Sequence, residues 1–435
     1  MKQRDVRRNL TVLTWVGALY GLAFGVYDLA LPLHLRSRGF TGMTGSLVYA
    51  VPVLVCIVVR LWVGPMSDRL GRKLFYGLAL LGSALSSLLT PFLPWVAGQV
   101  ALRSLRDASV AVRDTLHSIV LYETAKRRFI GMLGRIWGVQ ILSQCLGFLI
   151  VGYGLTWLLP HAAGGGVEKE GYGPVLILSG VMLVGVTVLF SRGFKEHVPA
   201  DGGSGDSSFL SDLFHLRLDS RLYVMMLSIL IFNLGFAACH TYIMFVFWPD
   251  KFGVSRIGMG WIMFVHRLLF ALPMLAVGRI VRGRLHRHRR LLMIVSLLLQ
   301  SATIVAAGVI RELWLALGIW LLHDLLGAGF WFPIRSELLQ RYCRGHARAA
   351  DTSKALAVAQ VGLLAGMLLA GWCYMVRTGD LVRSLFGMAA EARPVYGLAF
   401  VVGGIIMALS ALPLLLLPVI DPEERGEATA SGADA

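Results

Sequence analysis

The sequence predicts an all-α membrane protein with twelve transmembrane helices. Of its 435 residues, 56% are hydrophobic and only 15% are charged, whereas soluble domains are roughly 45–50% apolar and about 25% charged. Hydropathy divides the chain into twelve apolar segments, most of them near the length of about 20 residues that spans a bilayer. Basic residues gather in alternate connections between these segments, the pattern that marks the inner loops of membrane proteins.

The twelve segments form two sets of six, separated by a polar stretch. The first set lies at about 11–35, 43–66, 74–94, 97–120, 131–159 and 173–191, and the second at about 222–247, 257–281, 291–310, 313–334, 354–376 and 395–418. We therefore expect an N-terminal half at 1–190, a C-terminal half at 222–418, and a Gly- and Ser-rich cytoplasmic linker at 191–221. Residues 419–435 have the composition of a disordered cytoplasmic tail.

The formal net charge of +16 follows from this topology. More than half of the 41 Lys and Arg residues fall in the N-terminal segment or in the loops after every second span, so both termini are expected on the cytoplasmic side. No nucleic-acid-binding signature is present, and nucleic acid is not expected as a partner. No phosphate-binding loop, catalytic pattern or cofactor fingerprint occurs either, so we expect a protein that is not an enzyme and needs no cofactor.

The halves resemble each other weakly, because "VRDTLHSIVLYETAKRRF" closes span 4 and "IRSELLQRYCRGHARA" closes span 10. Two halves of the same sense are typical of a duplicated transporter, in which the substrate path follows the interface between the repeats.

The sharpest motif is "GPMSDRLGRK" at 64–73, between spans 2 and 3. A glycine at 64 lets two helices approach closely and a glycine at 71 permits a tight turn. The carboxylate can accept hydrogen bonds from a helix N-terminus or a nearby arginine. The residues assigned here to gating are Gly64, Asp68, Arg69, Gly71, Arg72 and Lys73.

This stretch resembles the signature loop of the major facilitator superfamily, G-x-x-x-D-R-x-G-R-[RK]. The resemblance implies the two-half major facilitator fold, transport by alternating access, and a latch between Asp68 and the start of span 11. There, "DTSKALA" offers Asp351, Thr352 or Ser353 as the helix cap. The loop after span 8 has Gly278 but no aspartate. Span 5 lacks the Gly-Pro element typical of drug/proton antiporters, which weighs against drug efflux.

Charged residues on span 4 share one helical face. At 100° per residue, six side chains of this span fall within an arc of about 120°: Arg103, Arg106, Asp107, Arg113, Asp114 and His117. Because lipid-facing charges are costly, we expect Arg103, Arg106 and Asp107 to face a central cavity and contact substrate or protons, with structural pairing as the alternative. Arg113 and Asp114 are assigned to gating. By resemblance, Arg103 occupies the arginine position of a family element R-x-x-x-G, with Asp107 in place of the glycine.

Further polar residues lie in other spans, and the resemblance implies that spans 1, 4, 7 and 10 line the cavity. The predicted cavity residues on these other spans are Asp28, Asn233, His240, His323 and Asp324. Asp28 is either a proton-binding site or a charge partner for a span-4 arginine. The pair His323–Asp324 is either a proton relay or buried packing. Three more side chains either reach the cavity, extend to the interface or pair structurally: Arg135, His266 and Arg267.

These features favour a secondary active transporter of a small polar, anionic or chelated solute, with protons as coupling ions, in a bacterial inner membrane or one derived from it. Residues 112–138 resemble facilitator proteins of magnetosome membranes, so an iron-related transporter is one alternative. A drug/proton efflux carrier and a non-transporting scaffold or sensor are the others. The expected partners are the solute, protons and membrane lipid. A divalent-metal site stays open, because the spacing of the candidate ligands His240, His323, Asp324, Asp28 and Asp107 does not specify one.

Overall fold

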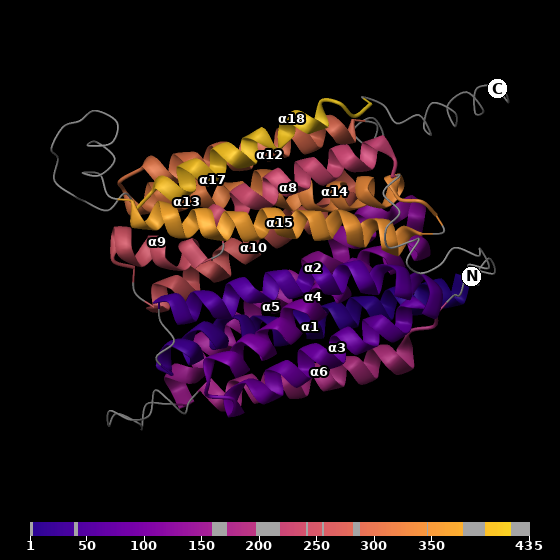
Figure 1. The fold of residues 1–435 in the computed structure, drawn as a ribbon, viewed down its shortest axis with the longest axis horizontal. Coiled ribbons are helices and arrows are strands. Elements are labelled where there is room, and N and C mark those ends of the chain that lie inside the picture. The colour runs from indigo at the N-terminus through magenta and orange to yellow at the C-terminus, as the bar shows by residue number, and fades with distance from the viewer. Residues whose placement is uncertain are drawn as a thin grey trace.

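The computed structural model describes residues 3–38, 42–158, 172–196, 218–240, 242–254, 256–281, 288–345, 347–376 and 396–418. Within these ranges the regular structure is helical, and the long helices lie side by side along one direction (Figure 1). Helices satisfy their own backbone hydrogen bonds, which is what an apolar bilayer demands of a spanning segment.

The first half contains six long helices. They are α1 (Gln3–Ser37), α2 (Gly42–Leu70), α3 (Arg72–Leu89), α4 (Val96–Ala125), α5 (Phe129–Leu158) and α6 (Tyr172–Gly193), with short turns η1 (Thr90–Phe92) and η2 (Lys126–Arg128).

The second half has its spans divided into more pieces. They are α8 (Ser220–His240), α9 (Tyr242–Phe252), α10 (Arg256–Ile280), α12 (Arg289–Val309), α13 (Leu313–His323), η4 (Asp324–Ala328), α14 (Gly329–Tyr342), α15 (Arg348–Met375), α17 (Leu398–Leu409) and α18 (Ala411–Leu414). The seventh predicted span corresponds to α8 with α9. The tenth is α13, η4 and α14 together, which continue to Tyr342, beyond the predicted end at 334.

Ten of the described helical segments are long and apolar enough to cross a membrane. Two more complete the set of twelve. Helix α4 is 30 residues long but carries the charges between 103 and 114, and the last span is the shorter apolar segment Leu398–Leu414. Large apolar side chains cover the outer surface, including Trp314 and Leu416 with exposures of 80% and 78%, as expected for a surface solvated by lipid. The fold-class prediction is confirmed.

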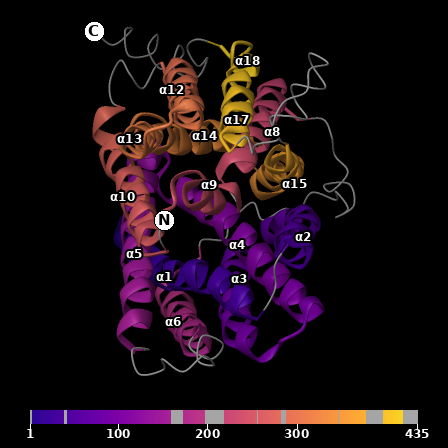
Figure 2. The same ribbon diagram turned by 90° about the vertical axis from the view of Figure 1, so that its left-hand side faces the viewer.

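The two halves have largely separate cores. One cluster of buried apolar residues comes mainly from α8 to α18, and two others mainly from α1 to α6. The halves meet where α2 packs against α15 and α5 against α10. Viewed along the helices, α1–α6 form one group and α12–α18 lie in the other (Figure 2). The linker and tail predicted at 191–221 and 419–435 lie mostly or wholly outside the described residues.

Candidate functional site

The halves are joined by polar contacts at the end of the bundle where α2 turns into α3, which we call the basic end because it carries Arg69, Arg72, Lys73, Arg344 and Arg348. Asp68 Oδ1 accepts a hydrogen bond from the Ala349 amide at 3.2 Å, and its Oδ2 accepts one from the Ala350 amide at 2.9 Å. Asp68 of the first half thus caps the N-terminus of α15 in the second, where the helix dipole favours a carboxylate.

Two glycines allow this contact. A Cβ built on Gly64 would lie 2.6 Å from the Cβ of Ser353 and 2.8 Å from the carbonyl oxygen of Ala349, so only a glycine lets α2 and α15 approach this closely. Gly71 has a φ of 93°, a left-handed conformation that lets the chain turn sharply between α2 and α3.

The structure corrects the expected cap of α15. The helix begins at Arg348 and its N-cap residue, Ala347, makes no side-chain capping bond, so the expectation that Asp351, Thr352 or Ser353 caps it is wrong. Asp351 instead accepts hydrogen bonds from the Arg344 side chain, at 2.9 Å from Nε and 2.7 Å from Nη2. The predicted eleventh span began at about 354, six residues after the start of the helix in the structure.

Two glutamates that the sequence analysis missed complete the basic end. Glu123 of α4 forms an ion pair with Arg72 of its own half and another with Arg348 of the other half, the latter at 3.6 Å. Glu196 accepts hydrogen bonds from the backbone amides of Arg72 and Lys73 and so caps α3. An acidic residue at the end of a span is the only sequence signal for either role.

In the first half, the charges near the start of α4 form a group with α1 and α2. Arg103 Nε donates to Asp107 Oδ2 at 2.9 Å, and the two side chains keep exposures of 16% and 25%. Tyr49 of α2 lies under the Arg103 guanidinium, 5.0 Å away. Asp28 of α1 is close enough to act electrostatically on both members of the pair.

Arg106 lies deeper in this group. It is 1% exposed, and its Nη1 donates to the Ser83 carbonyl and to Ser87 Oγ, both at 3.1 Å. Its guanidinium lies 4.3 Å from the ring centre of Tyr27. The remaining nitrogens, Nε and Nη2, are buried without a hydrogen-bond partner. Arg106 is therefore a buried cation with unused donors.

Arg113 and Asp114, predicted to act in gating, connect elements of one half. Arg113 donates to Asp114 at 2.7 Å and to Gln140 of α5 at 2.5 Å. Its guanidinium also lies 4.0 Å from the ring centre of Tyr20 of α1. The described partners of Arg113 belong to α1, α3, α4 and α5, because its side chain also hydrogen-bonds Tyr76 of α3. Their role in gating stays a prediction.

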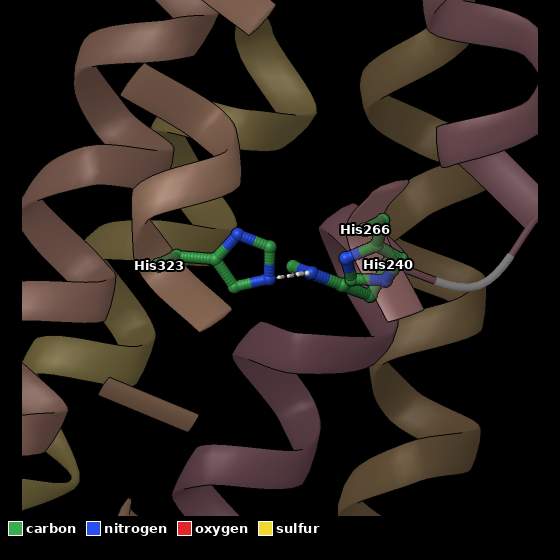
Figure 3. A group of neighbouring side chains, drawn as sticks. All are labelled: His240, His266 and His323. Atoms are coloured by element: carbon green, nitrogen blue, oxygen red, sulfur yellow. Dashed lines mark hydrogen bonds between the residues drawn. The ribbon is translucent and has the colours of Figure 1, made fainter. Parts of the chain in front are cut away.

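The second half brings three histidines together from separate helices. The ligand atoms of His240, His266 and His323 all lie within 4.8 Å of one another, and all three residues are buried (Figure 3). His240 Nε2 is 2.7 Å from His323 Nε2. Asp324 accepts a hydrogen bond from His266 Nδ1, and its other oxygen lies 3.3 Å from His323 Nε2. We call these four residues the histidine cluster.

Of the other sequence candidates, His266 joins the cluster although its role was left open. Arg267 follows it and acts electrostatically on Asp324. Asn233 donates to the Ala359 carbonyl at 2.9 Å, which ties α8 to α15. Arg135 is exposed on α5. Only the fold could show that His266 reaches the cluster, because position 266 lies on span 8, outside the four spans expected to line the cavity.

Curated relatives match this chain over limited segments. The multidrug resistance protein MdtG of Enterobacter lignolyticus is 27% identical over 197 residues, which are 43% of this chain and 44% of that protein. MdtG of Salmonella arizonae is 37% identical over 89 residues, 19% of this chain and 22% of the relative. The matched segments thus span less than half the length of these relatives.

Solved structures match over almost the whole chain. The human organic anion transporter MFSD10 has a TM-score of 0.68 at 17% identity, covering 94% of this chain and 99% of its own. The proton:xylose symporter XylE has a TM-score of 0.69 at 16% identity, with 95% of each chain covered. FucP, solved in an outward conformation, has a TM-score of 0.67 at 12% identity, with coverage of 93% and 97%. These identities show the fold alone.

The family follows from a match over most of the chain. The family model described as Major Facilitator Superfamily covers residues 13–353. Together with the spanning helices described above, this makes the protein a multi-pass membrane protein. The chain belongs to the major facilitator superfamily, a family of membrane transporters.

Proposed function

We propose that this transporter carries a small polar, anionic or chelated solute by proton-coupled alternating access. Its binding group is Asp28, Arg103, Arg106 and Asp107 in the first half. The basic end faces the cytoplasm, as its arginines and lysine favour, and the contact of Asp68 with α15 closes that end in one of the two conformations.

The observation that carries this proposal is the unused hydrogen-bonding capacity of Arg106. Its Nε and Nη2 are buried and lack partners, and an unsatisfied buried donor costs about 1–3 kcal/mol, more when it is charged. An ionisable residue inside a membrane span usually marks a functional site. A carboxylate or phosphate would supply acceptors in the fork geometry that guanidinium prefers.

Proton coupling follows from the charges of the same group. With both aspartates ionised, the charges of the two arginines and two aspartates sum to zero. The group then exerts no net electrostatic attraction on an anion. When Asp28 takes up a proton, the group becomes positive by one charge, and anion binding is favoured. Arg103 and Asp107 face Asp28 from α4, while Tyr27 and Tyr49 adjoin the group from α1 and α2. Proton and anion would therefore bind together.

The test is uptake into proteoliposomes under an imposed pH gradient, with citrate, phosphate and ferric citrate as solutes. We expect gradient-driven uptake of at least one. Arg106→Met removes charge-assisted hydrogen bonds of about 1.5–3 kcal/mol each, so uptake falls roughly tenfold to a hundredfold. Asp28→Asn imitates the protonated acid, so counterflow exchange persists while acceleration by the pH gradient disappears.

Arg311→Gln is the matched control, because Arg311 is an exposed arginine between α12 and α13. It should transport at the wild-type rate. If Arg106→Met and Asp28→Asn also transport normally, the binding group is wrongly assigned. If no solute moves under any gradient, the non-transporting scaffold or sensor becomes the better interpretation.

Drug efflux is the second candidate, favoured by the segments shared with the MdtG proteins. A lipophilic cation such as ethidium, assayed in the same vesicles, separates the two functions. Export of ethidium with no uptake of anions would select efflux. Residues 112–138 resemble magnetosome facilitators, which suggests an iron-related role. Uptake of ferric citrate in the assay above tests that role.

A further inference from the structure

We propose that His240, His266 and His323 bind a divalent first-row transition-metal ion, with Asp324 as the group that orients His266. This goes beyond the proposed function, because it names a ligand and its donors in the half opposite to the anion-binding group. It holds whether or not that group transports an anion. Imidazole nitrogen suits Zn²⁺, Fe²⁺, Ni²⁺ and Cu²⁺.

The distances between the nitrogens fit one ion after a small adjustment. In a tetrahedral site with Zn–N bonds of about 2.0–2.1 Å, the ligand nitrogens are about 3.3 Å apart. One ring nitrogen from each of the three histidines lies within 4.8 Å of one from each of the others, and the separation between His240 Nε2 and His323 Nε2 is 2.7 Å. Rotation of the side chains would lengthen the distance between His240 Nε2 and His323 Nε2 and shorten the longer distances between the ring nitrogens.

The outer nitrogens of two rings are already held as metal-binding histidines require. His323 Nδ1 hydrogen-bonds the Trp320 carbonyl. A carbonyl has no proton to give, so Nδ1 is the donor and Nε2 carries the lone pair. His266 Nδ1 donates in the same way to the Asp324 carboxylate. Metal-ligating histidines commonly donate their second N–H to a backbone carbonyl or a carboxylate, which fixes the tautomer and the ring orientation.

His240 completes the set and shows what the metal would replace. Its Nε2 faces the lone pair of His323 Nε2, so this nitrogen must carry the shared proton. Its Nδ1 is 3.4 Å from Cys239 Sγ. A divalent ion would displace the Nε2 proton, leaving His240 with its proton on Nδ1, next to the sulfur. Because the proton moves from Nε2 to Nδ1 of the same ring, metal binding changes the tautomer of His240 and releases no net proton.

The surroundings favour a binding site over inert packing. The three rings are 2–6% exposed and come from α8, α10 and α13, so separate elements converge on one point. The tenth span departs from α-helical geometry directly after His323, in the π-helical turn Asp324–Ala328, and π-bulges within helices occur frequently at functional sites. The carboxylate of Asp324 offsets the nearby cation of Arg267, so the cluster does not repel a metal ion.

The test is direct cobalt binding to the full-length, untagged protein in detergent after treatment with a chelator. Tetrahedral Co²⁺ absorbs visible light strongly, which reports coordination without any transport assay. We expect one Co²⁺ per chain at the cluster, displaced by Zn²⁺. His240→Gln, His266→Gln and His323→Gln should each weaken binding more than about 100-fold, since even outer-shell partners typically contribute 10- to 100-fold.

His117→Gln is the matched control, because His117 is equally buried and bonds Tyr76 at 2.9 Å in the other half. It should bind Co²⁺ as the wild type does. Asp324→Asn keeps an acceptor oxygen for His266 and removes the charge, so binding should weaken by about 10- to 100-fold with the tetrahedral spectrum retained. Monodisperse elution on gel filtration would show that each variant is folded.

No visible cobalt spectrum in the wild type, or an unchanged spectrum in the variant lacking all three histidines, would overturn the metal site. Cobalt binding without solute uptake would refute the proposed transport alone. Solute uptake without cobalt binding would refute the metal site alone.

Discussion

Replacing Asp68 by alanine should open the basic end of the bundle. The substitution removes the two hydrogen bonds that join Asp68 to the Ala349 and Ala350 amides. The Asp68 bond to Arg72 at 3.0 Å lies within one half, so its loss does not bear directly on the contact between the halves.

The expected shift can be worked from the bonds lost. Removal of a helix N-cap costs about 0.5–2 kcal/mol, and hydrogen bonds to charged groups contribute about 1.5–3 kcal/mol each. When the basic end opens, water takes over part of the capping interaction and of the hydrogen bonds. We therefore take about 2 kcal/mol as the net contribution of the Asp68 contact. A change of about 1.4 kcal/mol is tenfold in an equilibrium constant, so the closed-to-open ratio should fall about 30-fold.

The assay is a spin-label distance measurement across the basic end. Leu70→Cys and Gly345→Cys place labels at exposed positions of opposite halves, and the five native cysteines are all buried. In Asp68→Ala the short distance should give way to a longer one. Asp5→Ala is the control, because the Asp5 ion pair with Lys195, at 3.2 Å, joins α1 to the segment just after α6 and involves no helix of the second half.

An unchanged distance distribution in Asp68→Ala, together with a lowered melting temperature, would refute the reasoning. It would mean that Asp68 supports folding and does not set the balance between conformations.

Two further predictions concern packing and buried charge. Gly64→Ala should weaken the same contact and lower thermal stability by about 1–3 kcal/mol, the usual cost of overpacking, because its Cβ would lie 2.6 Å from that of Ser353. A Cβ added at Gly185 would have no neighbour within 4 Å, so Gly185→Ala should leave the melting temperature unchanged. If Gly64→Ala and Gly185→Ala changed the melting temperature equally, the packing argument would be refuted. Arg106→Met should melt near the wild-type temperature although it loses transport, because it removes two buried donors without partners, each of which costs about 1–3 kcal/mol. A large destabilisation would instead make Arg106 a structural residue.

The sequence was sufficient to predict the fold because the relevant signals are local. Apolar length identifies a span, and ten helical segments among the described residues meet that criterion. Helix α4 fails the simple criterion, yet the shared face of its charges still marks it as a span with a polar side. The motif at 64–73 pointed to a contact with the start of span 11, and Asp68 makes that contact.

The site could be predicted only in part, because its contacts depend on how distant helices turn toward each other. His240, His323 and Asp324 were expected near the cavity, but periodicity on one helix cannot tell that His266 joins them from α10. Glu123 was missed because its partners, Arg72 and Arg348, lie 51 and 225 residues away in the chain. Helix boundaries were the other weakness, as the start of α15 shows.

Glu123 is partly exposed at the basic end, so its ion pairs with the two halves are open to competition from the surroundings. This carboxylate, with an exposure of 32%, pairs with cations of both halves. Pairs this close to the aqueous phase weaken as ionic strength rises, and anionic lipid headgroups attract the same arginines. We therefore expect phosphatidylserine or cardiolipin to compete with Glu123 and favour separation of the basic end, so that bilayer composition becomes a regulator of the transport cycle.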